Sequence, residues 1–317
     1  MASKVIWFIY AVDYSLRNKL PFYKTKYCKR KYLSDLEGSN TITELLNSGR
    51  PFMAGRLGLF ELAAMRMYEF GKKDKYKLVM DNIYNCAGFF PNDISLGNKF
   101  LELTKDALKN ADFLASNGQL CENYFINKCM PAASVVSESF NVFYVFRDEV
   151  SWSKALAGKK VLVVTPFTES VLKQYAIREK LFPGNEELLP AMELSVYKSL
   201  MTVGDMKDER FSDWFQALDY MKNEILKLDF DLAILGCGAY GFPLAAEIKK
   251  SGRSAIHMGG SLQILFGIMG KRWDGTRTGK EIKIREDIAK YYNENWIYPI
   301  EDRPIGADKV EYGPYWK

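Results

Sequence analysis

The feature that most constrains the fold is a regular alternation of short apolar runs with helical patterns after Lys159. The runs at 161–165 (VLVVT), 231–235 (DLAIL) and 254–258 (SAIHM) are typical of parallel strands that are buried on both faces. The amphipathic helical patterns that separate or follow them are at 168–181, 208–228, 242–250 and 261–269. This alternation predicts an α/β fold: a mainly parallel, Rossmann-like sheet with helices on both faces and right-handed crossovers.

The first half of the chain carries similar but weaker signals. The predicted elements there are a strand at 52–55, helices at 59–70 and 95–110, and a strand at 140–146. Thr41 and Glu44 have capping-box spacing, which predicts a short helix at 42–47. Because no long linker interrupts the pattern, we expect a single catalytic domain over 46–317, preceded by a basic and aromatic arm over 1–45.

Composition narrows the classes of function. The chain has 317 residues, 48% of them hydrophobic, and a formal charge of +5, which suits anionic ligands but is too weak to indicate nucleic-acid binding. Its five cysteines lack CxxC spacing, so reduced thiols in a cytoplasmic protein are expected rather than disulfides or a zinc site. The single histidine excludes a metal site built from several histidines.

The N-terminal segment combines apolar and basic residues. The apolar run at 5–12 (VIWFIYAV) is too short to span a bilayer, and no cleavage site follows it, so no signal peptide is expected. The basic and aromatic residues that come next, without an acid, are Arg17, Lys19, Phe22, Tyr23, Lys24, Lys26, Tyr27, Lys29, Arg30, Lys31 and Tyr32. One interpretation is a solvated basic arm beside a buried edge strand. The other is peripheral contact of residues 5–32 with the inner face of an anionic membrane.

Two glycine turns follow neighbouring predicted strands. Gly236, Gly238 and Gly241 have the G-x-G-x-x-G spacing of dinucleotide-binding turns, and Gly259 and Gly260 end the next strand. Glycines at such places let a backbone approach a phosphate beside free helix N–H groups. The alternative is a tight strand–helix turn with no ligand.

His257 lies at the end of the strand predicted at 254–258, where a dinucleotide-binding fold would carry an acid for the ribose. No Asp or Glu occurs between Glu247 and Asp274, which weakens the hypothesis of a nicotinamide cofactor. His257 could bond a phosphate or a sugar hydroxyl, act as a base, or be a core residue bonded to a backbone carbonyl.

A third candidate is the turn Gly55-Arg56-Leu57-Gly58-Leu59-Phe60-Glu61. Arg56 ends the predicted strand at 52–55, and its guanidinium suits a phosphate or carboxylate. Glu61 enters the first turn of the following helix, as a general base, a metal ligand, or simply a favourable charge at a helix N-terminus.

Three segments together resemble the GT-D-type glycosyltransferases and related proteins of bacterial polysaccharide gene clusters. They are the turn at 56–61 (RLGLFE), the segment at 152–167 with its GKKVLVV core, and the long block at 231–274. The resemblance covers about residues 45–275. It implies a Rossmann-like, hexosyltransferase-type enzyme of polysaccharide biosynthesis that moves a sugar from a nucleotide-sugar donor to a polysaccharide, glycan or lipid-linked acceptor.

The positions described above, read together with the resemblance, give candidate roles to individual residues, of which Arg56, Gly58 and Glu61 match the family turn. Glu61 and His257 are the catalytic candidates. The donor-binding candidates are Gly55, Arg56, Gly58, Gly236, Gly238, Gly241, Gly259, Gly260, Gln263 and Arg272. The family turn reads R-x-G-D-x-E, whereas this chain has Leu59 at the Asp position, so only Glu61 remains to hold Mg²⁺ or Mn²⁺.

Two other classes of function stay open on the sequence. One is a Rossmann-type oxidoreductase or methyltransferase that uses the turn at 236–241 for its cofactor. The other is a catalytically silent nucleotide-binding protein of a polysaccharide system, a hypothesis that Leu59 keeps open.

Overall fold

A computed structural model of the chain describes residues 2–19, 30–145, 151–204, 206, 208–274, 286–304, 307 and 316. Within them, one eight-stranded sheet has the order β1-β4-β3-β2-β8-β7-β5-β6, and every neighbouring pair is parallel. The strands are β1 (Tyr32–Leu33), β2 (Met53–Gly55), β3 (Phe113–Ala115), β4 (Val135–Ser137), β5 (Lys160–Thr165), β6 (Glu193–Lys198), β7 (Leu232–Leu235) and β8 (Ser254–His257). The predicted α/β fold with a mainly parallel sheet is confirmed.

Helices fill the connections between the strands. The α-helices are α1 (Ala2–Lys19), α2 (Asp35–Asn47), α3 (Leu59–Glu69), α4 (Tyr76–Ala87), α5 (Gly97–Leu108), α6 (Glu122–Cys129), α7 (Thr168–Tyr175), α8 (Trp214–Ile225), α9 (Gly241–Lys250), α10 (Ser261–Leu265), α11 (Lys271–Asp274) and α12 (Glu286–Ala289). The short 3-10 helices are η1 (Lys73–Lys75), η2 (Ile94–Leu96), η3 (Phe140–Phe143), η4 (Trp152–Leu156), η5 (Arg178–Lys180), η6 (Glu186–Leu188) and η7 (Gly238–Tyr240). Among the described helices, none is both long and apolar enough to cross a bilayer.

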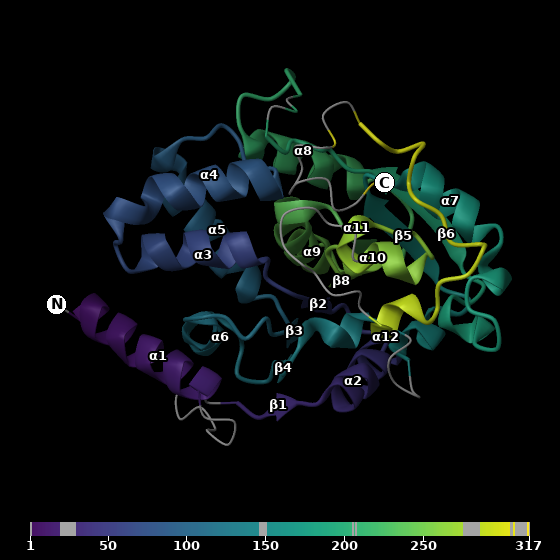
Figure 1. The fold of residues 1–317 in the computed structure, drawn as a ribbon, viewed down its shortest axis with the longest axis horizontal. Coiled ribbons are helices and arrows are strands. Elements are labelled where there is room, and N and C mark those ends of the chain that lie inside the picture. Colours follow the sequence, from purple (N-terminus) through teal and green to yellow (C-terminus); the bar gives the residue numbers. More distant parts are fainter. Residues whose placement is uncertain are drawn as a thin grey trace.

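The sheet separates two hydrophobic cores, and Figure 1 shows helices on both of its faces. Alternate residues of β5 supply the two sides: Leu162 and Val164 belong to the first core, and Val161 and Val163 to the second. Helices α3, α4, α5, α6, α8 and α9 pack in the first core, and α2, α7, α10, α11 and α12 pack in the second. Because both faces of the sheet are buried, the central strands are continuous apolar runs in the sequence.

The start of α2 differs from the prediction. Ser34 caps it: the Ser34 hydroxyl accepts from the Glu37 N–H at 3.2 Å, and the Glu37 carboxylate accepts from the Ser34 N–H at 2.9 Å. The capping box predicted at Thr41 and Glu44 is wrong, because Thr41 lies within the helix and donates to the Glu37 carbonyl. Two boxes with the same spacing lie one after the other in the sequence, and the earlier one begins the helix.

The strand predicted at 140–146 is also wrong. Within 140–146, residues Phe140–Phe143 form the 3-10 helix η3, because the Ser139 hydroxyl accepts from the Asn141 N–H at 2.8 Å and tightens the turn; residue 146 lies outside the described residues. Residues 5–12 belong to α1, and the edge strand next to the basic segment is β1. Within α1, Trp7 and Tyr10 pack against Phe70 and Tyr124 at ring distances of 5.4 and 5.6 Å.

The chain near its C-terminus is fastened to α7 by one buried carboxylate. Asp302, 6% exposed, accepts from the Glu169 N–H at 3.2 Å and from the Ser170 N–H at 2.8 Å. It therefore supplies the cap that the residue before α7, Phe167, lacks. Trp316 follows in sequence and is buried beside the Phe167 ring, with ring centroids 5.7 Å apart.

Replacing Asp302 by Ala should lower the free energy of unfolding by about 1–2 kcal/mol, because the α7 N–H groups lose a buried acceptor. The matched control is Glu301→Ala, which removes only the exposed ion pair with Lys173 and should cost less than about 0.5 kcal/mol. Urea unfolding followed by tryptophan fluorescence measures both changes. Equal effects of the two substitutions would contradict the capping role.

Candidate functional site

A cavity of about 460 Å³ lies at the carboxyl ends of the central strands. A cavity of this size suits a small molecule. Its walls come from the residues that follow β2, β3, β5, β6, β7 and β8, including Arg56, Asn117, Pro166, Ser199, Gly236 and Gly259. Further wall residues come from the end of α4, from η3 and the residue after it, from η7, and from α10 and the chain beyond it.

The cavity lies where neighbouring strands send the chain to opposite faces of the sheet. After β2 and β7 the chain enters α3 and α9 in the first core, whereas after β8 and β5 it enters α10 and α7 in the second. Each neighbouring pair along β2-β8-β7-β5 therefore meets the condition for a topological switch point. Open parallel sheets bind their ligands in the crevice at such points.

Arg56 supplies positive charge to the cavity. Its Nε donates to the Met258 carbonyl at 3.3 Å, and its guanidinium lies 5.5 Å from the centre of the Phe140 ring. A Cβ at Gly259 would lie 2.6 Å from the Arg56 Nη2, and Gly259 has φ of +60°, so only glycine allows the side chain to cross this turn. Within the described residues no carboxylate forms an ion pair with Arg56, which leaves most of its five N–H donors for an anion.

Glu61 is the carboxylate of the cavity wall. It lies in the first turn of α3 and folds back over the residue before the helix: a Cβ at Gly58 would lie 1.9 Å from a carboxylate oxygen of Glu61. Gly58 thus makes room for the carboxylate, which also complements the positive end of α3. Leu59, the position of the family Asp, is 51% exposed and lines the cavity as well.

His257 is only 5% exposed and forms part of the cavity wall. Burial, helped by the nearby Arg56 charge, lowers its pKa to about 3, and a hydrogen bond to the Leu235 backbone opposes the shift. The imidazole is therefore neutral at pH 7. Its Nδ1 lies 2.2 Å from where a Cβ of Gly241 would be, so Gly241 makes room for the histidine and does not itself line the cavity.

Of the remaining predicted site residues, four line the cavity and one lies behind a wall residue. Gly236, Gly238, Gly260 and Gln263 line the cavity. Gly55 lies behind His257, where a Cβ would be 3.3 Å from the histidine Cβ. Arg272 belongs to α11, and its side chain lies outside the described part of the structure.

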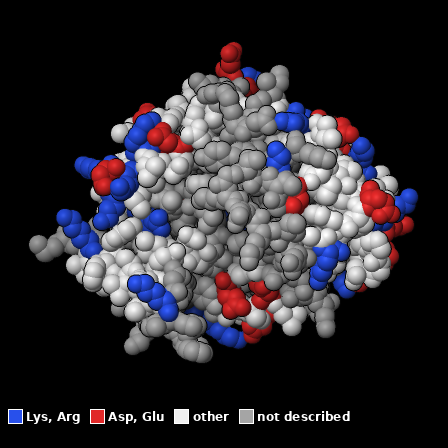
Figure 2. Space-filling model, in the orientation of Figure 1, with Lys and Arg blue, Asp and Glu red and all other residues white. Residues whose placement is uncertain are grey.

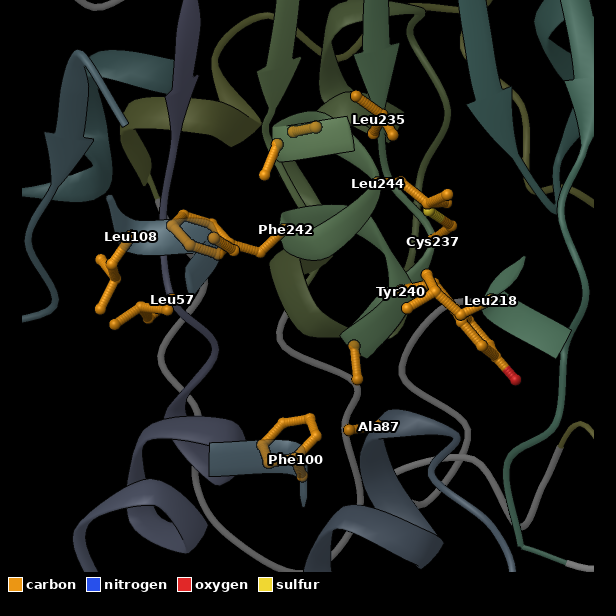
Figure 3. Packing of buried hydrophobic residues seen from close by; sticks show 14 of the residues in the cluster. Leu57, Ala87, Phe100, Leu108, Leu218, Leu235, Cys237, Tyr240, Phe242 and Leu244 are labelled. Carbon is orange, nitrogen blue, oxygen red and sulfur yellow. The ribbon is translucent and has the colours of Figure 1, made fainter. Parts of the chain in front are cut away.

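The turn at 236–241 is built differently from a phosphate loop that opens directly into a helix. Gly238 has φ of +59° and begins the 3-10 helix η7, which lies between β7 and α9. Figure 3 shows Phe242, in the first turn of α9, pointing toward Leu57 and Leu108 in the first core. Tyr240 stacks on Trp214 at 5.0 Å. Packing therefore fixes this turn without a ligand, while Gly236 and Gly238 still face the cavity.

Asn117 is a wall residue that the sequence did not single out. The buried Glu122 carboxylate holds its loop by accepting from the Ser116 hydroxyl at 2.8 Å, the Asn117 N–H at 3.0 Å and the Gln119 N–H at 3.1 Å. Asn117 also donates to the Leu57 carbonyl, which joins this loop to the turn that carries Arg56. An apolar triplet, 113–115, followed by Ser-Asn-Gly is the sequence signal that would have found it.

Another part of the wall, the loop after β6, was also missed. The Thr202 hydroxyl lies 2.6 Å from the Gly88 carbonyl and 2.7 Å from the Tyr240 hydroxyl, which ties the loop to α4 and η7. Ser199 begins the same loop, and its hydroxyl is buried without a hydrogen-bond partner among the described residues, like the Asn117 side-chain oxygen and the His257 Nδ1. These three polar atoms belong to wall residues but are themselves buried, so the described residues leave their hydrogen bonding incomplete.

Aromatic rings make up much of the rest of the wall. They belong to Phe60, Phe140, Tyr144, Phe167, Tyr240, Trp273 and Trp316. Planar rings of this kind bind nucleobases by stacking and sugars through their apolar faces. Of the ionised groups, only Arg56 and Glu61 are found among the described wall residues.

The cavity wall offers few ligands for a metal ion. In the described part of the chain, no cluster of three or more His, Cys, Asp and Glu side chains could hold an ion. Glu61 is the only carboxylate among the described wall residues. A divalent ion there would need most of its oxygen ligands from a bound phosphate and water, so the residues do not form a protein-made metal site.

Comparison with known proteins gives one weak likeness. No protein-family model matches the chain, and no curated protein matches it. Two solved structures do match, each with 12% identity and a TM-score of 0.41, over 86% of this chain and 96% of theirs. One is the selenomethionine-substituted domain of unknown function 1792, and the other presents that highly conserved domain as having a distinct glycosyltransferase fold.

The buried histidine should give stability a defined pH dependence. The unfolded chain takes up a proton on histidine near pH 6.5, and folded His257 takes one up only near pH 3. Between these values the unfolded state binds more protons, so stability rises with pH, by up to about 1.4 kcal/mol per unit, and levels off above about pH 6.5.

The difference in unfolding free energy between the wild type and His257→Gln isolates this contribution, because other titrating groups are common to both. Urea unfolding at pH 5, 6 and 7 should show the wild type losing stability faster than the variant as the pH falls. Parallel pH profiles would show that His257 is not buried as a neutral imidazole.

Proposed function

We propose that the chain is a glycosyltransferase that moves a sugar from a nucleotide-sugar donor to a glycan or lipid-linked acceptor. One observation carries the proposal: an arginine without an ion pair among the described residues and a carboxylate flank the same β2–α3 turn, in an aromatic cavity at the switch points of the sheet. The arginine can neutralise the charge of a diphosphate leaving group, and the carboxylate can take the proton of an acceptor hydroxyl.

The proposed reaction assigns a step to each group. The acceptor oxygen bonds to the anomeric carbon of the donor sugar while the bond from that carbon to the diphosphate oxygen breaks. Glu61 takes the hydroxyl proton, and Arg56 holds the departing diphosphate. Gly236, Gly238, Gly259 and Gly260 supply the backbone against which the diphosphate lies. Ring stacking by the aromatic wall residues binds the nucleobase.

His257 acts in this proposal as a neutral hydrogen-bonding group. A pKa near 3 leaves its imidazole too weakly basic at pH 7 to take a proton from a sugar hydroxyl. A neutral imidazole can still bond a hydroxyl or phosphate oxygen. Of the two catalytic candidates in the sequence, Glu61 therefore receives the role of base.

A second candidate function rests on the position of the Glu61 carboxylate. Because it folds over Gly58 at the start of α3, it could serve only the helix N-terminus, and the chain would then bind a nucleotide without catalysing transfer. Nucleotide binding is common to both functions, and only transfer activity separates them. An oxidoreductase is less favoured, because β8 ends in His257 and not in an acid for a ribose.

Arg56→Ala should weaken the binding of nucleoside diphosphates about 10- to 100-fold, since a charge-assisted contact to phosphate is lost. Isothermal titration calorimetry with UDP, GDP and ADP measures the change for whichever nucleotide binds the wild type. The control is Arg50→Ala, which removes an exposed arginine. Equal affinities of the wild type and Arg56→Ala would place the anion elsewhere, and a wild type that binds only NAD(H) would overturn the proposal.

Glu61→Gln should abolish sugar transfer and leave nucleoside diphosphate affinity within about threefold, because the amide keeps the shape but cannot accept the proton. Transfer is followed by release of the nucleoside diphosphate from candidate nucleotide sugars with glycan acceptors. A variant that retains transfer would exclude Glu61 as the base.

The same assay tests whether sugar transfer requires a divalent metal ion. EDTA should slow the wild type only modestly, because one carboxylate is a poor magnesium or manganese site. Leu59→Asp, which adds a second carboxylate at an exposed wall position, should increase the dependence on Mn²⁺. Complete loss of wild-type activity in EDTA, restored by Mn²⁺, would show that a metal is required.

A further inference from the structure

Helix α1 leaves an apolar stripe uncovered. Val5, Phe8 and Val12 are 55%, 67% and 40% exposed, and their spacing of three and four residues puts them on one face of the helix. The opposite face is held in place: Trp7 packs on Phe70, and Tyr10 packs on Tyr124. The stripe is therefore not needed to attach α1 to the rest of the protein.

The charged side chains of α1 that the structure shows to be exposed are both positive. Lys4, one turn before Phe8, and Lys19, two turns after Val12, are exposed. The only acid of the helix, Asp13, is 3% exposed. In Figure 2 the surface at the lower left, over α1, is white and blue, whereas both signs alternate around the rest of the rim. Beyond the helix, the sequence from 20 to 31 carries five Lys and Arg residues and no acid.

We propose that α1 docks on an anionic membrane surface, with Val5, Phe8 and Val12 among the acyl chains and the lysines at the headgroups. An apolar helix face with basic residues beside it can lie in the plane of the interface, with the apolar side chains among the acyl chains and the charges at the headgroups. Since α1 does not meet the length and hydropathy of a spanning helix, it binds peripherally. This inference does not depend on the proposed function.

A second copy of the chain suits the stripe less well. Self-association through this face would bring the lysines of two copies together, and three apolar side chains offer far less area than the roughly 800 Å² per partner of a stable interface. A membrane with acidic headgroups instead complements these lysines, and its affinity rises with the basic residues nearby.

The test is sedimentation of the whole chain with vesicles of phosphatidylcholine alone or with about one third phosphatidylglycerol. The chain should bind the anionic vesicles at least tenfold more tightly, and binding should fall as salt is raised. Phe8→Ser should weaken this binding at least tenfold, and Lys4→Glu with Lys19→Glu should do the same. The control is Ile300→Ser, a 68% exposed apolar residue in a C-terminal segment distant from α1 in Figure 1, and it should bind like the wild type.

Three results would overturn the inference. They are equal binding to both kinds of vesicle, unchanged binding of Phe8→Ser, and a dimer in light scattering that Phe8→Ser converts to a monomer. Phe8→Ser should keep the nucleoside diphosphate affinity of the wild type. If the chain does not bind anionic vesicles but still binds nucleoside diphosphates, the docking of α1 is wrong. The proposed function is then unaffected.

Discussion

The parallel pairing of β2 with β8 is the contact on which the site depends. It joins residues about two hundred positions apart: Met53 lies beside Ala255, and Gly55 lies beside His257. On one side of this seam the sheet continues through β3, β4 and β1, and on the other through β7, β5 and β6. If β2 slipped by one residue, Met53 and Ala54 would exchange the two cores, so burial on both faces fixes the register.

The seam also explains the glycines. Several of them occur where a polar side chain of the site crosses the backbone: Gly259 under Arg56, Gly241 beside His257, and Gly58 under Glu61. A glycine spacing that resembles a dinucleotide-binding turn is thus in part a packing pattern for the groups next to the cavity. The charged and aromatic side chains of the cavity wall are therefore better evidence for the kind of ligand than the glycine spacing is.

The cavity wall carries few charged side chains, and this limits the reactions that it can catalyse. An apolar, aromatic cavity with a single cation and a single carboxylate among its described wall residues strengthens each electrostatic contact, because little water competes inside it. The same environment keeps His257 neutral and raises the pKa of the buried Cys237 thiol to about 12, so neither is ionised at pH 7. The reactive groups that remain are the two on the β2–α3 turn.

By itself the sequence determined the class of fold, the strands at the centre of the sheet and the two ends of the β2–β8 seam, because buried parallel strands leave continuous apolar runs. It did not reveal β1, β3 and β4, which have two or three residues each, or β6, an edge strand whose residues are half exposed. It also misplaced the start of α2 and predicted a strand at 140–146, since capping and 3-10 turns depend on single hydrogen bonds. Only the tertiary structure decided that Asn117, Ser199 and Trp316 meet Arg56 and Glu61 in one cavity, because that meeting follows from the strand order, which no local pattern encodes.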